Sequence, residues 1–262
     1  MRVARVGLAV LKGTRHQERS TVELSAQGPV GDRRFCLVDA GRGQVLKTVE
    51  HGALLAATAD WQDGVLSVDL AGRVLAGVPE PTGSVLEVDY WGRPVTAAVV
   101  GGPWAAAFSA VLGRPVELAQ VVPGAIVYGG QVSVITTASL AALRAERRTG
   151  ADGPEPLDPV RDAARFRATV LVDTEDSPYA EPGSERSWIG RELDLGPARI
   201  RLTSSIVRCA VVDLEPVSGR PDLRLLRALP RDDTSRPIFG LEGEVVSSGL
   251  VSRGDRVATI GP

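Results

Sequence analysis

The sequence predicts a mainly β protein with two β-rich lobes and a few helices. Its apolar residues occur in short alternating or continuous runs, and Gly, Pro and Asp separate these runs. That pattern is typical of strands joined by turns. The chain has 262 residues, which is enough for one large core or two medium ones. We expect a division after the first helix, which gives residues 1–115 and 116–262.

The predicted strands are distributed along the whole chain. The N-terminal apolar stretch breaks at Lys12-Gly13 and lacks a small-residue cleavage site, so we interpret it as the first strand rather than a signal peptide. In order, the predicted strands cover residues 3–11, 21–24, 34–38, 65–70, 85–90, 96–100, 116–121, 132–135, 168–172, 193–195, 199–203, 210–214, 243–246 and 256–260.

Four segments have the apolar spacing of helices. Residues 103–112 place Trp104 and Phe108 on one face, and Gly113 ends the segment. Residues 137–148 follow a threonine that can cap a helix. Residues 158–165 open with an Asp-Pro pair, and residues 222–229 carry three leucines at helical spacing.

The composition excludes several classes of protein. A formal net charge of -2 lacks the basic excess of a general nucleic-acid binder. No apolar run reaches the roughly 20 residues that a membrane helix needs. We therefore expect a cytoplasmic protein that binds neither nucleic acid nor membrane. The two cysteines and two histidines lack the spacing of a zinc site, are too few for an ordinary iron–sulfur cluster and give no disulfide framework.

Several polar residues suit an anionic ligand. Lys12, Arg33 and Arg167 supply cations from three separate segments. Hydroxyls come from Thr136, Thr137 and Thr169. The step from strand to helix at 136–139 would leave backbone N–H groups free at a helix N-terminus, which attracts anions. We predict that these groups converge on one cleft between the lobes.

The two cysteines have different surroundings. Cys36 lies between Phe35 and Leu37 in a predicted strand, which indicates an inert core residue. Cys209 follows Arg208, and a cation beside the sulfur would favour the thiolate, which is the metal-binding form. A soft thiolate suits a thiophilic metal better than magnesium or calcium. Alternation along this segment leaves the direction of the Cys209 side chain open.

Taken together, these motifs resemble the MOSC family, named for the C-terminal domain of molybdenum cofactor sulfurases. The most specific part is Arg208-Cys209 with Asp213 and the following Glu-Pro-Val-Ser-Gly219, which is similar to the family signature Arg-Cys…Asp-Pro-x-Thr-Gly. The resemblance covers nearly the whole chain and is nearest to the branch of the amidoxime-reducing component. It implies an N-terminal β-barrel lobe followed by a MOSC domain.

The resemblance also implies a set of cofactor contacts. Cys209 would ligate molybdenum, and Lys12, Arg33 and Arg167 would hold the pterin of the molybdenum cofactor (molybdopterin). We expect further cofactor contacts from the other residues of these motifs: Gly129, Gly130, Thr136, Thr137, Thr169 and Arg208. The chain departs from the family pattern at four places: Gly13 replaces a serine, Thr169 an asparagine, Val49 an arginine, and Gly129-Gly130 a Thr-Ser pair. Lys47 can replace the missing cation only if it points inward.

The function that the resemblance implies is reduction of an N-oxygenated small molecule, such as an N-hydroxylated amidine. The chain has no flavin fingerprint and no cluster cysteines, so a separate electron-transfer protein or reductase is expected to supply electrons. Asp176 is a candidate for handling a proton near the metal. Two alternatives stay open: a protein that carries or sulfurates the cofactor, and a pathway-specific enzyme that keeps the fold without the cofactor.

Overall fold

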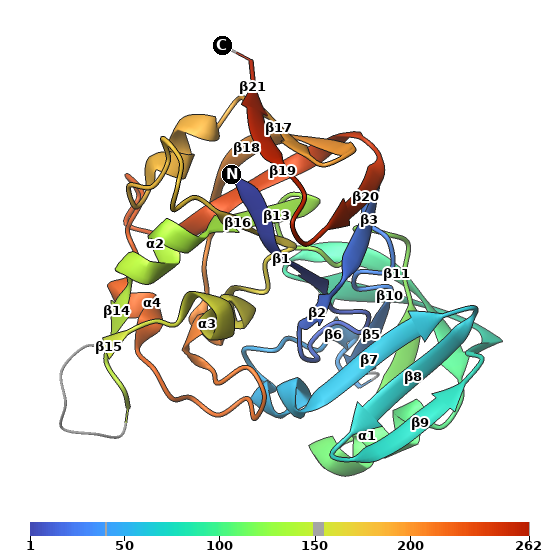
Figure 1. Cartoon of the computed structure of the whole chain (residues 1–262). Helices are drawn as coiled ribbons and strands as arrows, with labels where there is room; N and C mark the ends of the chain where they lie inside the picture. Colours follow the sequence, from blue (N-terminus) through green and yellow to red (C-terminus); the bar gives the residue numbers. More distant parts are fainter. Residues whose placement is uncertain (40, 149–154, 262) are drawn as a thin grey trace.

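A computed structural model describes residues 1–39, 41–148 and 155–261 of the chain (Figure 1). It confirms the prediction of a mainly β protein with few helices. The two ends of the described chain lie side by side, since the backbone N–H of Val257 donates to the carbonyl oxygen of Met1 at 3.0 Å. None of the described helices is long and apolar enough to cross a membrane.

The largest sheet among the described residues has eight strands in the order β2-β1-β16-β13-β19-β18-β17-β21. Neighbouring strands are antiparallel except β13 and β16, which run parallel. The bounds are β1 Arg2–Leu8, β2 Gln17–Arg19, β13 Val132–Thr136, β16 Val170–Asp173, β17 Glu192–Leu195, β18 Ala198–Val207, β19 Ile238–Ser247 and β21 Val257–Ile260.

Five strands of the described chain close into a barrel, as the family resemblance implied. Their bounds are β5 Phe35–Asp39, β6 Gln44–Val45, β10 Glu80–Tyr90, β11 Arg93–Gly101 and β12 Glu117–Gln120. Cys36 and Tyr90 lie in the apolar interior of this barrel, and neither has measurable exposed surface. The assignment of Cys36 to the core is therefore confirmed.

A smaller sheet of β7 (Ala57–Gln62), β8 (Val65–Leu70) and β9 (Arg73–Gly77) packs beside the barrel, at the lower right of Figure 1. Helix α1 (Trp104–Leu112) covers it, and the indole of Trp104 donates to the carbonyl oxygen of Leu75 at 3.1 Å. Short strands complete the described sheets: β3 Thr21–Ser25, β4 Gly28–Pro29, β20 Gly249–Ser252, β14 Arg144–Ala145 and β15 Glu155–Pro156.

Three sequence-based element predictions need correction. The helix expected over 137–148 is α2 (Thr137–Ala142), because the chain turns extended at Leu143 and pairs as β14 with β15. The helix expected over 222–229 shortens to α4 (Leu225–Ala228). The strand expected over 210–214 is instead the 3-10 helix η3 (Ala210–Asp213). Two other short helices are η1 (Gly52–Ala56) and η2 (Ser184–Trp188), and α3 (Pro159–Phe166) lies where it was predicted.

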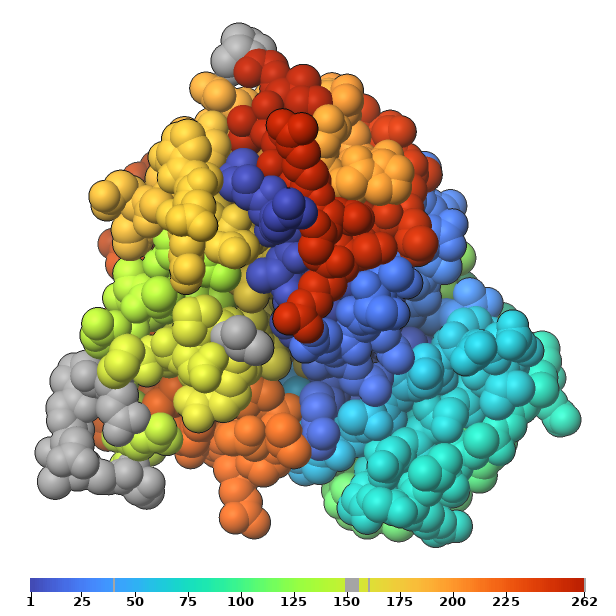
Figure 2. All heavy atoms as spheres, in the orientation of Figure 1, coloured from blue at the N-terminus to red at the C-terminus, as the bar shows by residue number. Residues whose placement is uncertain are grey.

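Strands from the two ends of the chain are interleaved. β1 pairs with β16 inside the large sheet, and β3 pairs with β20. β12 lies beyond residue 116 yet pairs with β5 and β11 in the barrel. The space-filling view shows the same contact, with the N-terminal segment in blue lying directly against the C-terminal strands in red (Figure 2).

Candidate functional site

The turn after β1 places Lys12 beside Arg33. The backbone N–H of Lys12 donates to the carbonyl oxygen of Phe35 at 2.8 Å, and the backbone N–H of Arg33 donates to that of Ala9 at 2.7 Å. Arg33 adopts a left-handed backbone conformation with φ of 47° and forms an ion pair with Asp32. These backbone bonds fix two cations from separate segments at one end of the barrel.

Arg167 joins them from the turn between α3 and β16. It also has a left-handed conformation, with φ of 52°, and its Nη1 donates to the carbonyl of Thr14 at 2.6 Å. Arg208 holds this turn against β19, because its guanidinium donates to the carbonyl oxygens of Phe166 at 2.9 Å and Phe239 at 2.8 Å. The charges of Arg33 and Arg167 both act on Lys12, so these three predicted cations lie close together.

Cys209 lies at the break between β18 and η3, with its side chain exposed. Because β18 ends at Val207, strand alternation does not set the direction of the Cys209 side chain; the turn before η3 does. The sulfur-bearing residue borders a cavity of about 200 Å³ together with Lys12, Lys47, Thr48, Val49, Tyr90, Trp91, Tyr128, Val207, Arg208 and Val211. We call this the Cys209 pocket.

Beside the Cys209 pocket, Lys12 belongs to a group of charged side chains with an excess of positive charge. Burial, with the charges of Arg33 and Arg167, lowers the pKa of Lys12 to about 7, although Asp32 and Cys209 oppose the shift. Burial and the charge of Arg33 likewise lower the pKa of Arg167 to about 10. Three cations with one close carboxylate form a cluster that an added anion would stabilise.

Several buried donors in this region have no partner among the described residues. They are Nη2 of Arg167, Nη2 of Arg208 and the hydroxyl of Tyr90. Buried polar groups are nearly always hydrogen-bonded in native proteins. Free donors beside a cation cluster therefore indicate a place for a ligand that brings acceptor atoms.

The mouth of the pocket is aromatic. The rings of Trp91 and Tyr128 are both exposed, and their centroids lie 5.8 Å apart. Lys47 does reach the pocket, with its Nζ 4.3 Å from the Trp91 ring centroid and 3.5 Å from a carboxylate oxygen of Glu50. It thus supplies a cation close to Val49, where the family has an arginine, although Glu50 shares the charge.

The start of α2 does not join the cation cluster, so that part of the convergence prediction is wrong. β13 runs parallel to β16 with Thr136 beside Val172, whereas Arg167 precedes the start of β16. The helix start therefore lies beside the end of β16 that is away from Arg167. Its groups have partners there: Thr136 caps the N–H of Ser139, and Thr137 Oγ1 lies 3.4 Å from Asp173.

Two further predicted contacts are occupied by the protein itself. Thr169 is buried, and its hydroxyl lies 3.3 Å from the Ser133 hydroxyl. The N–H of Gly130 donates to the Glu242 carboxylate at 2.8 Å, and a Cβ atom at Gly129 would come within 2.0 Å of the same carboxylate. The Gly129-Gly130 backbone thus holds an internal carboxylate.

The position of Asp176 gives no support to its predicted role. It is exposed in the loop that follows β16, at the end of the strand away from Arg167. It does not border the Cys209 pocket. We therefore leave Asp176 out of the proposed site.

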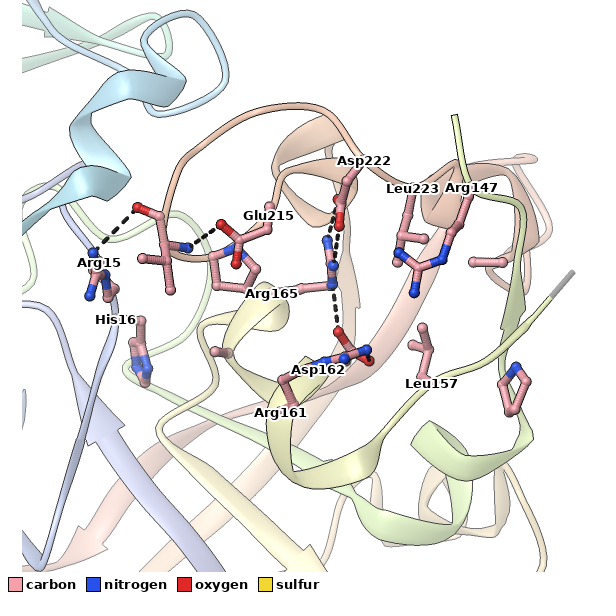
Figure 3. A pocket seen from close by; sticks show the side chains of 15 residues that line it. Arg15, His16, Arg147, Leu157, Arg161, Asp162, Arg165, Glu215, Asp222 and Leu223 are labelled. Carbon is pink, nitrogen blue, oxygen red and sulfur yellow. Dashed lines mark hydrogen bonds and ion pairs between the residues drawn. The ribbon is translucent and has the colours of Figure 1, made fainter. Parts of the chain in front are cut away.

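A second cavity, of about 290 Å³, lies between α3 and the loop that carries Glu215 (Figure 3). Its central guanidinium, Arg165, is held between Asp162 at 2.9 Å and Asp222 at 2.7 Å. Arg15 donates there to backbone carbonyls, including that of Val217 at 3.3 Å. These pairings neutralise the central cation, unlike the cluster at Cys209.

Sequence reasoning missed Tyr90, Trp91 and Tyr128. The available signal was the Trp91-Gly92 pair, where both residues have positive φ and close the hairpin between β10 and β11. Such a turn marks the end of two strands. It does not indicate that the end of this hairpin borders Cys209, since that depends on long-range packing of the barrel against β18.

Comparison with known proteins gives two matches to family models. The MOSC N-terminal beta barrel domain matches residues 2–115, and the MOSC domain matches residues 119–258. No curated protein matches the chain. A crystal structure of the YUAD protein from Bacillus subtilis is 11% identical, covers 98% of this chain and 94% of its own, and superposes with a TM-score of 0.40, which is too remote to carry an argument.

Proposed function

The chain belongs to the MOSC family, and on this premise we propose that it binds a molybdenum cofactor through Cys209 and reduces N-oxygenated small molecules. MOSC domains are associated with proteins that bind this cofactor. The finer assignment, to reduction of N-hydroxylated substrates, follows the resemblance to the branch of the amidoxime-reducing component.

One observation carries the proposal: an exposed cysteine borders the same pocket as Lys12, beside a cluster of cations in which buried hydrogen-bond donors have no partner among the described residues. The cluster favours an anionic, oxygen-bearing group such as the phosphate of a pterin cofactor. The thiolate form of Cys209 suits a thiophilic metal. Among the described residues, no group of three His, Cys, Asp or Glu side chains is placed to hold a metal ion.

The roles of the chain's own residues follow from their contacts. Lys12, Arg33 and Arg167 would neutralise the anionic group, and Arg208 would keep Arg167 in place by holding the carbonyl of Phe166. Cys209 would be the protein's ligand to the metal. When bound, the cofactor supplies two-electron oxygen-atom transfer. Trp91 and Tyr128 form the rim that a substrate passes.

The overall reaction would convert R–NHOH, two electrons and two protons into R–NH₂ and water. The sequence has no flavin fingerprint and too few cysteines for an ordinary iron–sulfur cluster, so we propose a separate electron-transfer protein or reductase as the donor. The aqueous mouth of the pocket gives protons access to the site, because Cys209 is exposed there.

The experiment is steady-state reduction of an N-hydroxylated amidine with an artificial electron donor. We expect turnover by the parent chain and none by Cys209→Ala, because the metal loses its protein ligand. Cys36→Ala is the matched control and should keep nearly full activity, since Cys36 is enclosed in the barrel core. Equal turnover by Cys209→Ala and the parent would refute the proposed role. Molybdenum bound without turnover would favour a cofactor carrier instead.

A further inference from the structure

Tyr90 occupies a fixed position at the edge of the Cys209 pocket. It is the last residue of β10 and pairs with Arg93, the first residue of β11. The turn between them, Trp91-Gly92, has φ of 56° and 77°, the double left-handed geometry of a tight hairpin. Because β10 pairs with β11 on one side and with β6 on the other, the backbone of this tyrosine has little freedom to move.

Its ring lies between cations. Nζ of Lys12 and the guanidinium carbon of Arg93 each lie 5.3 Å from the ring centroid. Both distances are within the range of a cation–π contact. These contacts hold the ring but use none of the hydrogen-bonding capacity of its hydroxyl.

The hydroxyl of Tyr90 is the unusual feature. The residue has no measurable exposed surface, and the hydroxyl has no hydrogen-bond partner among the described residues. Burial raises the pKa of the phenol, and the charges of Arg33 and Arg167 act in the opposite direction. At neutral pH the group is therefore a neutral phenol that keeps its proton and can donate it in a hydrogen bond.

The surroundings restrict what can accept that hydrogen bond. Lysine and arginine side chains have only donors, so the nearby cations cannot serve as acceptors. A ligand that satisfies both the cations and the phenol must carry negative charge on oxygen. The free Nη2 of Arg167 requires an acceptor of the same kind.

We propose that Tyr90 is a ligand-binding residue of the Cys209 pocket, whose hydroxyl donates a hydrogen bond to an oxygen of an oxyanion held by Lys12, Arg33 and Arg167. The Tyr90 hydroxyl would favour anions that place an oxygen within hydrogen-bonding distance of it over anions that do not. The inference rests on the proposed function only in placing a ligand beside Cys209. It does not depend on which substrate is reduced.

The test is the binding of inorganic phosphate to the full-length chain, prepared free of cofactor, by calorimetry. The parent should bind, and Tyr90→Phe should bind roughly three- to tenfold more weakly, because one hydrogen bond is lost. Phenylalanine keeps the ring and its cation contacts. Tyr179→Phe is the matched control and should bind like the parent, since Tyr179 does not line the Cys209 pocket and its hydroxyl lies 3.2 Å from that of Thr259. Thermal unfolding would verify that both variants are folded.

A second measurement needs no change to Tyr90. The chain has three tyrosines, so carbon-13 at the tyrosine Cζ gives three resonances. Phosphate should shift the Tyr90 resonance and leave that of Tyr179, whose hydroxyl lies 3.2 Å from Thr259, in place. Unshifted Tyr90, or equal phosphate affinity in the parent and Tyr90→Phe, would overturn the inference. If these binding results hold but no N-hydroxylated compound is reduced, the proposed function fails while the role of Tyr90 stands.

Discussion

Arg167 shows how a single residue can be placed for binding. Its left-handed backbone and its bond to Thr14 direct the guanidinium toward the cluster, while Nη2 stays free. Left-handed geometry costs free energy in a residue with a side chain, and such strain is concentrated at functional sites. We infer that the conformation is kept because it serves the anion.

We predict that Arg167→Ala lowers cofactor occupancy. A hydrogen bond to a charged group contributes roughly 1.5–3 kcal/mol, so affinity should fall about tenfold or more. Molybdenum per chain, measured after purification under identical conditions, reports the loss. Arg15→Ala is a useful control, because Arg15 donates to backbone carbonyls at the second cavity. Unchanged molybdenum content in Arg167→Ala would contradict the assignment.

Lys12 gives the site a pH dependence. Its pKa is lowered to about 7 in the folded chain, below the usual 10.5. Between these values the unfolded chain binds more protons, so this residue makes the folded state more stable as pH rises through that window. Anion binding has the opposite dependence, because it needs the protonated amine.

We therefore predict that phosphate affinity of the cofactor-free chain falls as pH rises above about 7. The change should be absent in Lys12→Met, which keeps the length of the side chain and removes its titration. Calorimetry from pH 6.5 to 9 measures it, a range over which the second proton of phosphate must be included in the fit. A parent and a variant with the same pH profile would show that Lys12 does not contribute.

At the scale of elements, the loop after Cys209 is tied to the other half of the chain by two glycines. Gly219 has φ of 70°, and a Cβ atom there would come within 1.8 Å of the carbonyl oxygen of Gly52, at the start of η1. This backbone-to-backbone approach explains the glycine at the end of the Glu215–Gly219 motif in packing terms. It joins the Cys209 loop to the turn that carries Lys47.

We predict that Gly219→Ala destabilises the protein by about 3 kcal/mol or more, from left-handed strain and the forced separation of two backbones. Chemical denaturation measures the change. Gly254→Ala is the control for backbone strain alone, because Gly254 has φ of 90° and no atom lies near the position of a Cβ. It should lower the free energy of unfolding by about 1–2 kcal/mol. Equal costs at the two positions would mean that the contact with Gly52 is not tight.

The elements also show what could be predicted from the sequence. The long alternating strands and α1 were found, because their periodicity is local. The 210–214 run was misassigned, since an apolar triplet fits a strand or a short helix equally well. The cations of the site were identified, but the aromatic side of the pocket was not, because it depends on how the barrel hairpin meets β18.

At the scale of the whole molecule, the interleaving of strands has a consequence for folding. β1 lies between β2 and β16 in the large sheet, although it comes from the first residues of the chain. A fragment of residues 116–262 would lack this strand and expose the edge of β16. An unpaired buried edge is unfavourable and prone to aggregation.

We predict that the 116–262 fragment does not fold cooperatively alone and recovers when residues 1–115 are co-expressed. Thermal unfolding by circular dichroism, with the full-length chain as reference, tests this. A sharp transition in the isolated fragment would indicate that the MOSC domain is stable without β1.

The central claim is that this chain holds a molybdenum cofactor at Cys209. Elemental analysis of the full-length chain, purified from a host that makes the cofactor, tests it most directly when combined with the metal's X-ray absorption spectrum. The account predicts molybdenum close to one atom per chain and a sulfur contribution that Cys209→Ala removes but Cys36→Ala does not. Absence of molybdenum from the folded parent, or an identical spectrum in Cys209→Ala, would contradict it.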